Sequence, residues 1–215
     1  MLPEETAGSE LATIEEEGSS LSFREYSTAP EFDKEDVQLP RLRIAQGLTP
    51  EVQMGMARPG QWVLTGYEPE ESVTLIPLAY AKAREYRVDG ELLCSSPNAL
   101  VGRGSPGGAC SACPMAQWQE KPDGKKHKPC SLVFSYVAYS ITHGSPVVLE
   151  FKRTGERSAR RLNTFIQARG LGNFALKVGA KPAQWGKNSG FEPTIDLAKV
   201  EPDVLEEARA LPMAA

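Results

Sequence analysis

Residues 94–130 read CSSPNALVGRGSPGGACSACPMAQWQEKPDGKKHKPC, and this stretch holds every cysteine of the 215-residue chain. Cys110 and Cys113 form a C-x2-C pair, with Cys94 sixteen residues before it and Cys130 seventeen residues after it. Thiolates at this spacing can bind one ion together, and the outer two complete a tetrahedron when the chain folds back. The pattern predicts one structural zinc (Zn2+) site with these four cysteines as ligands.

Two alternatives to a four-cysteine site remain open at this point. His127 lies three residues before Cys130 and could replace one of the cysteines, and two disulfides could replace the metal. Four protein ligands leave no position for water, so a zinc ion held in this way is structural and not catalytic. A zinc deaminase would need Pro before the pair and an upstream His/Cys-x-Glu, whereas Ala109 precedes Cys110 and both histidines lie downstream.

No other catalytic pattern is present in the sequence, and we predict that the protein is not an enzyme. Residues 102–107 match G-x-G-x-x-G, but a dinucleotide-binding motif follows a strand and opens a helix. Here the stretch contains Pro106 and runs into Gly108 and Cys110, which predicts a flexible loop.

The chain around the cysteine-rich stretch reads as strands joined by hairpins. We expect extended segments at 39–44, 61–64, 73–88, 91–94, 131–141, 147–151, 174–178 and around 194–195, with a tight turn at Asp89-Gly90. Residues 158–169 predict the main helix, with Ser158 as N-cap and Gly170 as its end, and 201–210 a short one. This set predicts a mainly β (α+β) fold: an OB-fold-like small barrel with a zinc-bound loop insertion at 94–130, and acidic flexible termini.

Charge is segregated along the sequence and divides it into three parts. Residues 1–38, an expected acidic flexible tail, carry eleven acids and two bases. Residues 39–187, the expected nucleic-acid-binding domain, carry twenty bases and eleven acids, and residues 188–215 carry six acids and two bases. A basic body between acidic ends indicates a polyanionic partner, with tails that compete for its surface or keep the protein soluble.

Basic residues alternate with aromatic residues on the predicted strands. Aromatic side chains on a sheet can stack single-stranded bases while Lys and Arg contact the phosphates. Duplex bases are already stacked, so this pattern favours unpaired strands. The candidate nucleic-acid-binding residues are Lys82, Arg84, Tyr86, Tyr136, Tyr139, Lys152, Arg153, Arg157, Arg160 and Arg161.

On these features, residues 39–181 resemble the single-stranded DNA-binding proteins of tailed bacteriophages. The likeness lies in the Arg/Tyr-bearing strand pair, the C…CSAC…C insertion, the hairpin and an acidic tail. It implies an OB-fold that coats single-stranded DNA during phage replication or recombination, with an acidic tail that recruits replication or recombination proteins. The chain departs from the family in carrying its strongest acidic segment at the N-terminus, and in offering four cysteines where some members use three and one histidine.

The leading hypothesis is therefore a non-catalytic single-stranded DNA-binding protein with a structural zinc ion. The alternatives are a zinc-containing adaptor that binds a protein such as a polymerase through Trp118 and the lysines of 125–128, and a transcription regulator that reads duplex DNA. The acidic start of the chain and the lack of a membrane-length apolar run predict the cytoplasm, the host's if the gene is a phage's, and no membrane partner.

Overall fold

The computed structural model describes residues 38–122 and 124–211. The chain divides into two units, Met1–Val37 and Gln38–Ala215, so the acidic segment expected at 1–38 lies, apart from Gln38, outside the described residues. The strands are β1 (Arg41–Ile44), β2 (Trp62–Val63), β3 (Ser72–Val88), β4 (Glu91–Ser96), β5 (Val101–Gly104), β6 (Gly108–Ala109), β7 (Gln119–Glu120), β8 (Lys126–His127), β9 (Cys130–Ser140), β10 (Ser145–Lys152), β11 (Ala175–Trp185) and β12 (Asn188–Ala198). The helices are α1 (Pro50–Gln53), α2 (Glu156–Arg169) and α3 (Pro202–Ala210), with 3-10 turns η1 (Pro114–Ala116) and η2 (Arg153–Gly155).

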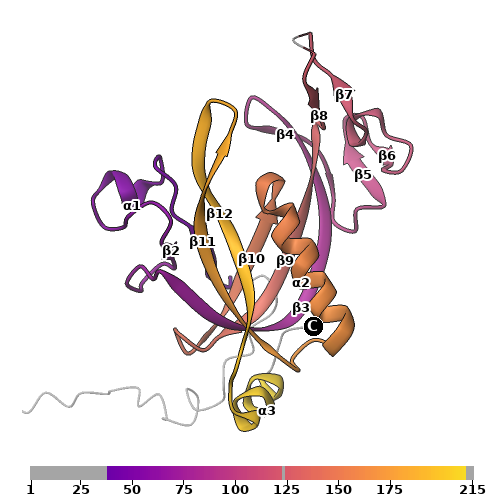
Figure 1. The fold of residues 1–215 in the computed structure, drawn as a ribbon. Coiled ribbons are helices and arrows are strands. Elements are labelled where there is room, and N and C mark those ends of the chain that lie inside the picture. The colour runs from indigo at the N-terminus through magenta and orange to yellow at the C-terminus, as the bar shows by residue number, and fades with distance from the viewer. Residues whose placement is uncertain (1–37, 123, 212–215) are drawn as a thin grey trace, which may run out of the picture. The chain divides into compact units, whose positions relative to one another are not determined.

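The sheet is organised on the long strand β3. One edge of β3 pairs with β9, while the other edge pairs with β11 at its start and with β4 at its end. The sheet therefore forks into a β11–β12 arm and a β4–β5–β6 arm, which separate along β3 (Figure 1). Beyond β9 the order continues through β10, β1 and β2, and β1 runs parallel to β10.

A mainly β fold with few helices is confirmed, but the barrel is not. Within residues 38–122 and 124–211 the sheet ends at β2, β6 and β12 and does not close, so the OB-fold is not confirmed. The reason lies in β3, which is long enough to hold two separate partners on one edge. The fork splits the sheet where a barrel would need one continuous edge.

Alternation along β9 decides which face of the sheet is buried. Leu132, Phe134 and Tyr136 point to one face, where they pack with Leu162 and Ala159 of α2. The predicted hairpin turn at Asp89-Gly90, with φ of 49° and 89°, and the predicted end of α2 at Gly170 are confirmed. The expected N-cap is wrong: α2 begins two residues before Ser158, whose hydroxyl donates to the carbonyl of Pro193.

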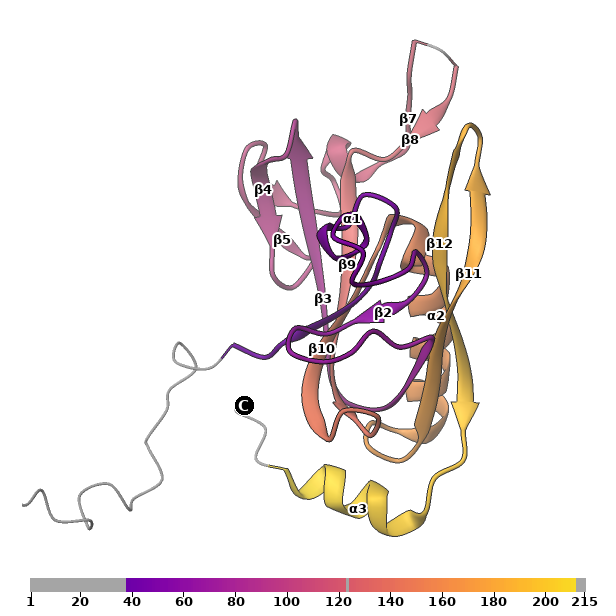
Figure 2. The same ribbon diagram turned by 90° about the vertical axis from the view of Figure 1, so that its left-hand side faces the viewer.

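Among the described residues, the opposite face is covered only at one end, by α3. Ala208, Val204 and Leu205 pack on Ile76 and Tyr139 near the start of β3. The cysteine-rich insertion lies at the other end of β3, beyond β4 (Figures 1 and 2). This leaves the sheet face near the insertion free of helices in the part of the chain that is described.

The C-terminal part continues the sheet before it reaches a helix. The predicted boundary at residue 187 falls in the turn between β11 and β12, and the eleven residues of β12 pair along the whole of β11. Residues 188–198 are therefore strand and not part of a flexible acidic end. No helix among the described residues is long and apolar enough to cross a membrane.

Candidate metal centre and nucleic-acid interface

All four cysteines line one small cavity at the insertion end of β3. Cys94 comes from β4 and Cys130 from the start of β9, and both pair with Tyr86 of β3, so sheet pairing brings them together. Cys110 and Cys113 approach from the loop that follows β6. The cavity measures about 10 Å³, which is room for one ion or one water and excludes a nucleotide. None of the four cysteines forms a disulfide.

The glycine-rich stretch at 102–107 forms a wall of this cavity and is not a free loop. A Cβ atom at Gly102 would lie 2.8 Å from the Sγ atom of Cys94, and one at Gly104 would clash with the carbonyl oxygen of Leu93. Gly104 also has a φ of 108°, which a side chain disfavours. The glycines are needed because β5 passes close to Cys94, and they explain the G-x-G-x-x-G match without a phosphate.

The thiols are grouped but not arranged as a finished ligand set. Among residues 38–122 and 124–211, no three His, Cys, Asp or Glu side chains are positioned to hold a metal ion. The thiols nevertheless influence one another. Burial raises the pKa of Cys130, the hydrogen bond and charge of Arg84 lower it, and charge on Cys110 and Cys113 raises it. His127 lines a different cavity, which shares Tyr86 and Met115 with the cysteine cavity.

The even-numbered residues of β3 do not form the interface that their alternation suggested. Tyr80, Lys82 and Arg84 lie opposite Tyr136, Phe134 and Leu132 of β9, on the face that α2 covers. Lys82 stays exposed at the edge of this face, while Arg84 points into the cysteine cavity. Tyr86 lines both the cysteine cavity and the cavity that His127 lines.

Tyr136 and Tyr139 are packing residues, which corrects their predicted role in stacking bases. Tyr136 is fully buried and its hydroxyl donates to Asn163 Oδ1 at 2.7 Å. Burial is the main reason that the pKa of this phenol lies far above its ordinary value, and the charge of Tyr80 raises it further. Tyr139 is half-buried against α3.

The arginines of α2 lie apart from the sheet face near the insertion. Arg160 pairs with Glu156 at 3.5 Å, and Arg161 pairs with Asp196 at 2.9 Å and lies over the ring of Phe165. Arg157 is exposed on the same helix. None of these three arginines lines the cavities that Lys152 and Arg153 line.

The odd-numbered residues at the end of β3 line a basic concavity beside the insertion. It measures about 740 Å³, and its basic lining residues are Arg87, Lys121, Lys128 and Arg153. A neighbouring cavity of about 240 Å³ shares Arg87 and Arg153 and adds Lys152. Arg153 adopts a φ of 48°, a conformation that costs a residue with a side chain about 1 kcal/mol.

Glu85 sits among these cations and holds two of them. Its Oε2 accepts from Lys152 at 3.2 Å and from Arg87 at 3.3 Å. Burial opposes ionisation of Glu85, but the hydrogen bonds and charges of Lys152 and Arg87 outweigh burial and lower its pKa. The carboxylate therefore stays ionised at neutral pH and competes with any other anion for the two cations.

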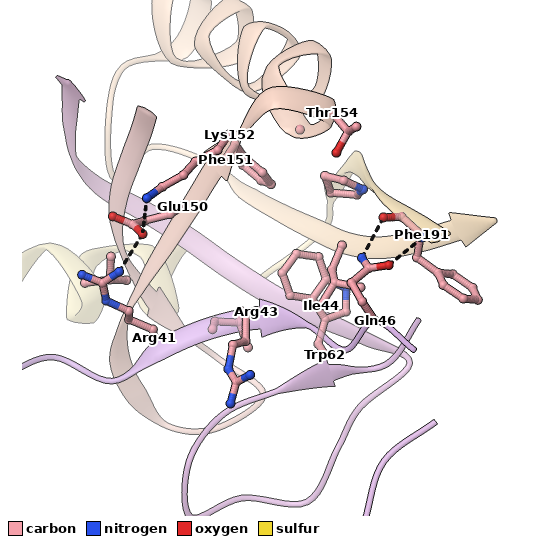
Figure 3. A pocket seen from close by; sticks show the side chains of 14 residues that line it. Arg41, Arg43, Ile44, Gln46, Trp62, Glu150, Phe151, Lys152, Thr154 and Phe191 are labelled. Atoms are coloured by element: carbon pink, nitrogen blue, oxygen red, sulfur yellow. Dashed lines mark hydrogen bonds and ion pairs between the residues drawn. The ribbon is translucent and has the colours of Figure 1, made fainter. Parts of the chain in front are cut away.

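A further cavity, of about 350 Å³, opens where β1 and β10 diverge beyond their short parallel pairing (Figure 3). On one side Glu150 bridges Arg41, at 2.8 Å, and Lys152, at 3.9 Å. On the other side Gln46 fixes the backbone of Phe191 through two hydrogen bonds, donating to its carbonyl at 2.9 Å and accepting from its N–H at 3.0 Å. The cavity thus has a charged side and an aromatic side.

Lys152 lines both this cavity and the one beside Glu85, which in turn shares Arg87 and Arg153 with the concavity beside the insertion. The cavities of about 350, 240 and 740 Å³ therefore form a continuous series along the sheet. We call the seven basic residues that line them the basic track: Arg41, Arg43, Arg87, Lys121, Lys128, Lys152 and Arg153. The acidic lining residues are Glu85, Asp89 and Glu150. The series therefore carries net positive charge.

Sequence reasoning found two members of the basic track as candidate sites, Lys152 and Arg153. Arg41 and Arg43 alternate with apolar residues in the sequence but were not candidate sites. Arg87 lies one position outside the alternating set on β3 that includes Lys82, Arg84 and Tyr86. No local signal marks Phe191, because its neighbour Gln46 is 145 residues away. The sequence matches no known family model, and neither the curated proteins nor the solved structures contain a match to this chain.

Proposed function

We propose that this protein binds single-stranded DNA without catalysis and that a structural zinc ion supports its binding surface. The observation that carries the proposal is the basic track, which gives a flexible polyanion a continuous path across an open sheet face. The resemblance to phage single-stranded DNA-binding proteins suggests the setting, in which the protein coats and protects replication or recombination intermediates.

Phosphates would replace the weak ion pairs that now occupy the basic track. Arg41 and Glu150 form such a pair, with 62% and 23% of their side chains exposed. Pairs of this kind are worth about 0–1 kcal/mol, so exchanging a carboxylate for a phosphate costs little. Contacts to phosphates carry no sequence information, which predicts binding to strands of any sequence and a strong dependence on salt.

Bases would stack at the aromatic side of the cavity in Figure 3. Phe191 is half-buried there, and its ring lies against Gly60, where an added Cβ would be 2.5 Å from the ring. Trp185 of the same hairpin lies next to Gly190. Stacking on a side chain of this type contributes about 1–3 kcal/mol per base and tolerates every base.

A zinc ion fits the donor set and the room at the cysteine cavity. Four thiols line a space large enough for one ion, and zinc prefers such ligands in a closed tetrahedron. Binding requires the thiols to move closer together, because no three of them are now positioned to hold a metal ion. The ion would connect β4, β9 and the loop after β6, and it would supply no chemistry beyond this connection.

The metal centre and the basic track share a wall, which links the two halves of the proposal. Tyr86 and Met115 line both the cysteine cavity and the concavity of Arg87. Zinc would therefore fix the insertion residues that contribute Lys121 and Lys128. This arrangement makes the shape of the binding surface depend on the metal.

Competition between single-stranded and duplex DNA tests the proposed function. Trp185 is 38% exposed and reports binding through its fluorescence. We expect oligo(dT) to quench this emission, and unlabelled single strands of any sequence to compete, while a duplex of equal length competes poorly. Preferential competition by the duplex would instead support a regulator that reads promoter DNA.

Replacing Glu85 by glutamine should strengthen DNA binding, because it releases Lys152 and Arg87 to the phosphates. In each of these ion pairs the cation is partly exposed, so the pair is weak. We therefore expect about a two- to fivefold gain in affinity, corresponding to at most about 1 kcal/mol. Oligo(dT) titrations of Glu85→Gln and of Glu207→Gln, which makes the same charge change on α3, measure it. An equal gain in both variants would attribute the effect to net charge alone.

The exposed Trp118 favours one second candidate, a zinc-containing adaptor that binds another protein. Its side chain is 69% exposed next to the β7–β8 hairpin, which carries Lys126. Exposed tryptophans are enriched at the centres of protein interfaces. This candidate predicts no affinity for oligo(dT) and a stoichiometric protein complex that Trp118→Ala disrupts.

A further inference from the structure

Arg84 occupies the centre of the cysteine-rich end of the sheet. It lies on β3 between Ser96 of β4 and Leu132 of β9, two residues before the position that pairs with both Cys94 and Cys130. Its side chain lines the cysteine cavity. Of the sequence-predicted nucleic-acid ligands, this one is therefore turned toward the candidate metal centre.

Two of the three nitrogen atoms in the guanidinium group of Arg84 are buried and, among the described residues, unpaired. Its Nε and Nη1 atoms are inaccessible to solvent and have no hydrogen-bond partner in the part of the chain that is described. Arginine keeps its charge at all accessible pH values, so it cannot relieve its burial by losing a proton. A buried cation needs an anionic partner, since the alternative costs several kcal/mol.

The candidates for this anionic partner are the cysteine sulfur atoms, because all four cysteines line the same cavity as Arg84. Two disulfides would be neutral and would leave the cation unpaired. Four thiolates around one Zn2+ carry a net charge of −2, which Arg84 would reduce to −1.

We propose that Arg84 is the charge partner of the cysteine site, donating hydrogen bonds from its guanidinium group to ligand sulfur atoms when zinc is bound. This inference rests on the zinc site proposed above and not on DNA binding. Arg84 acts through the ligands and is a positioning residue. Hydrogen bonds to ligand sulfurs hold the thiolate form and slow the loss of the metal, and outer partners of this kind are worth 10–100-fold in metal affinity.

Zinc affinity of charge and shape variants tests this role. Arg84→Met keeps an unbranched apolar side chain and removes the charge, and Arg84→Lys restores the charge. Arg103→Met removes an exposed arginine of the same insertion as a control. The measurements are the zinc dissociation constant from chelator competition and the sulfur-to-cobalt absorption band after Co2+ substitution. Circular dichroism checks that each variant is folded.

We expect Arg84→Met to bind zinc about 10–100-fold more weakly and to shift the cobalt band, with partial recovery in Arg84→Lys and no change in Arg103→Met. If Arg84→Met does not fold, Arg84→Lys decides the matter, because a compact ammonium cannot reproduce the planar fork of donors and should bind zinc more weakly than wild type. Wild-type zinc affinity in a folded Arg84→Met variant would overturn the inference, and so would wild-type affinity in Arg84→Lys where Arg84→Met does not fold. A wild-type protein that takes up no zinc would overturn the metal site itself, whatever its affinity for DNA.

Discussion

Replacing Cys110 and Cys113 by serine should abolish zinc binding and weaken oligo(dT) binding about tenfold or more, a loss of at least about 1.4 kcal/mol. The insertion cannot hold its shape alone, because β5 to β8 contain only two to four residues each. Metal binding supplies the folding free energy of such a segment. Its loss would release Lys121 and Lys128 from the basic track.

Three measurements on the same sample separate this effect from general unfolding. Metal analysis gives the zinc content, limited proteolysis reports the order of residues 94–130, and thermal unfolding reports the core under α2. We expect cleavage confined to the insertion, with the core transition retained. Ser111→Ala, which changes the exposed residue between the two ligands, serves as the control. Unchanged zinc content in the double serine variant would refute the ligand assignment.

Reversing charge at Arg87 and Arg153 together should produce the largest loss of DNA binding. Both line the concavity beside the insertion, and each reversal removes one phosphate contact and adds a repulsive charge. Single strands lose about 0.7 units of salt slope per contact, so the slope should fall by about 1.4. We expect affinity at low salt to fall at least about a hundredfold, since each reversal costs about 1.4 kcal/mol or more.

The matched control reverses two charges on the other face of the sheet. Arg157→Glu with Arg160→Glu makes the same change in net charge on α2, where the two arginines are exposed. The account predicts a nearly unchanged salt slope for this helix variant. Equal losses in both double variants would mean that net charge, and not the basic track, governs the binding.

Alternation in the sequence predicts the buried face of β9 but not the faces of β3. Along β9 the buried face was readable, because Leu132, Phe134 and Tyr136 are large and their neighbours are smaller or polar. Along β3 both phases carry charge: Lys82 and Arg84 on one, Glu85 and Arg87 on the other. A shift of one residue exchanges the faces, and the phase that was favoured, with Lys82 and Arg84, lies on the face that α2 covers.

Long-range pairing explains most of the other differences. The forked sheet depends on β11 pairing with the start of β3 about a hundred residues earlier, as in Val178 beside Val73, and no local pattern specifies that contact. The spacing of the cysteines predicted the grouping of Cys94 with Cys130, but only half of it is local. The hairpin around Asp89-Gly90 brings Cys94 to Tyr86, whereas Cys130 reaches Tyr86 through the long-range pairing of β9 with β3. Burial of Arg84 was not predictable, because an arginine on a predicted strand gives no sign of the cavity it enters.

The most direct test is a titration of the full chain with oligo(dT) at several salt concentrations, with zinc content measured on the same sample. The account predicts one zinc per chain and a logarithm of the binding constant that falls linearly with the logarithm of salt concentration, at about 0.7 per phosphate contacted. Protein that contains no zinc and shows no binding to oligo(dT) in dilute buffer would contradict it.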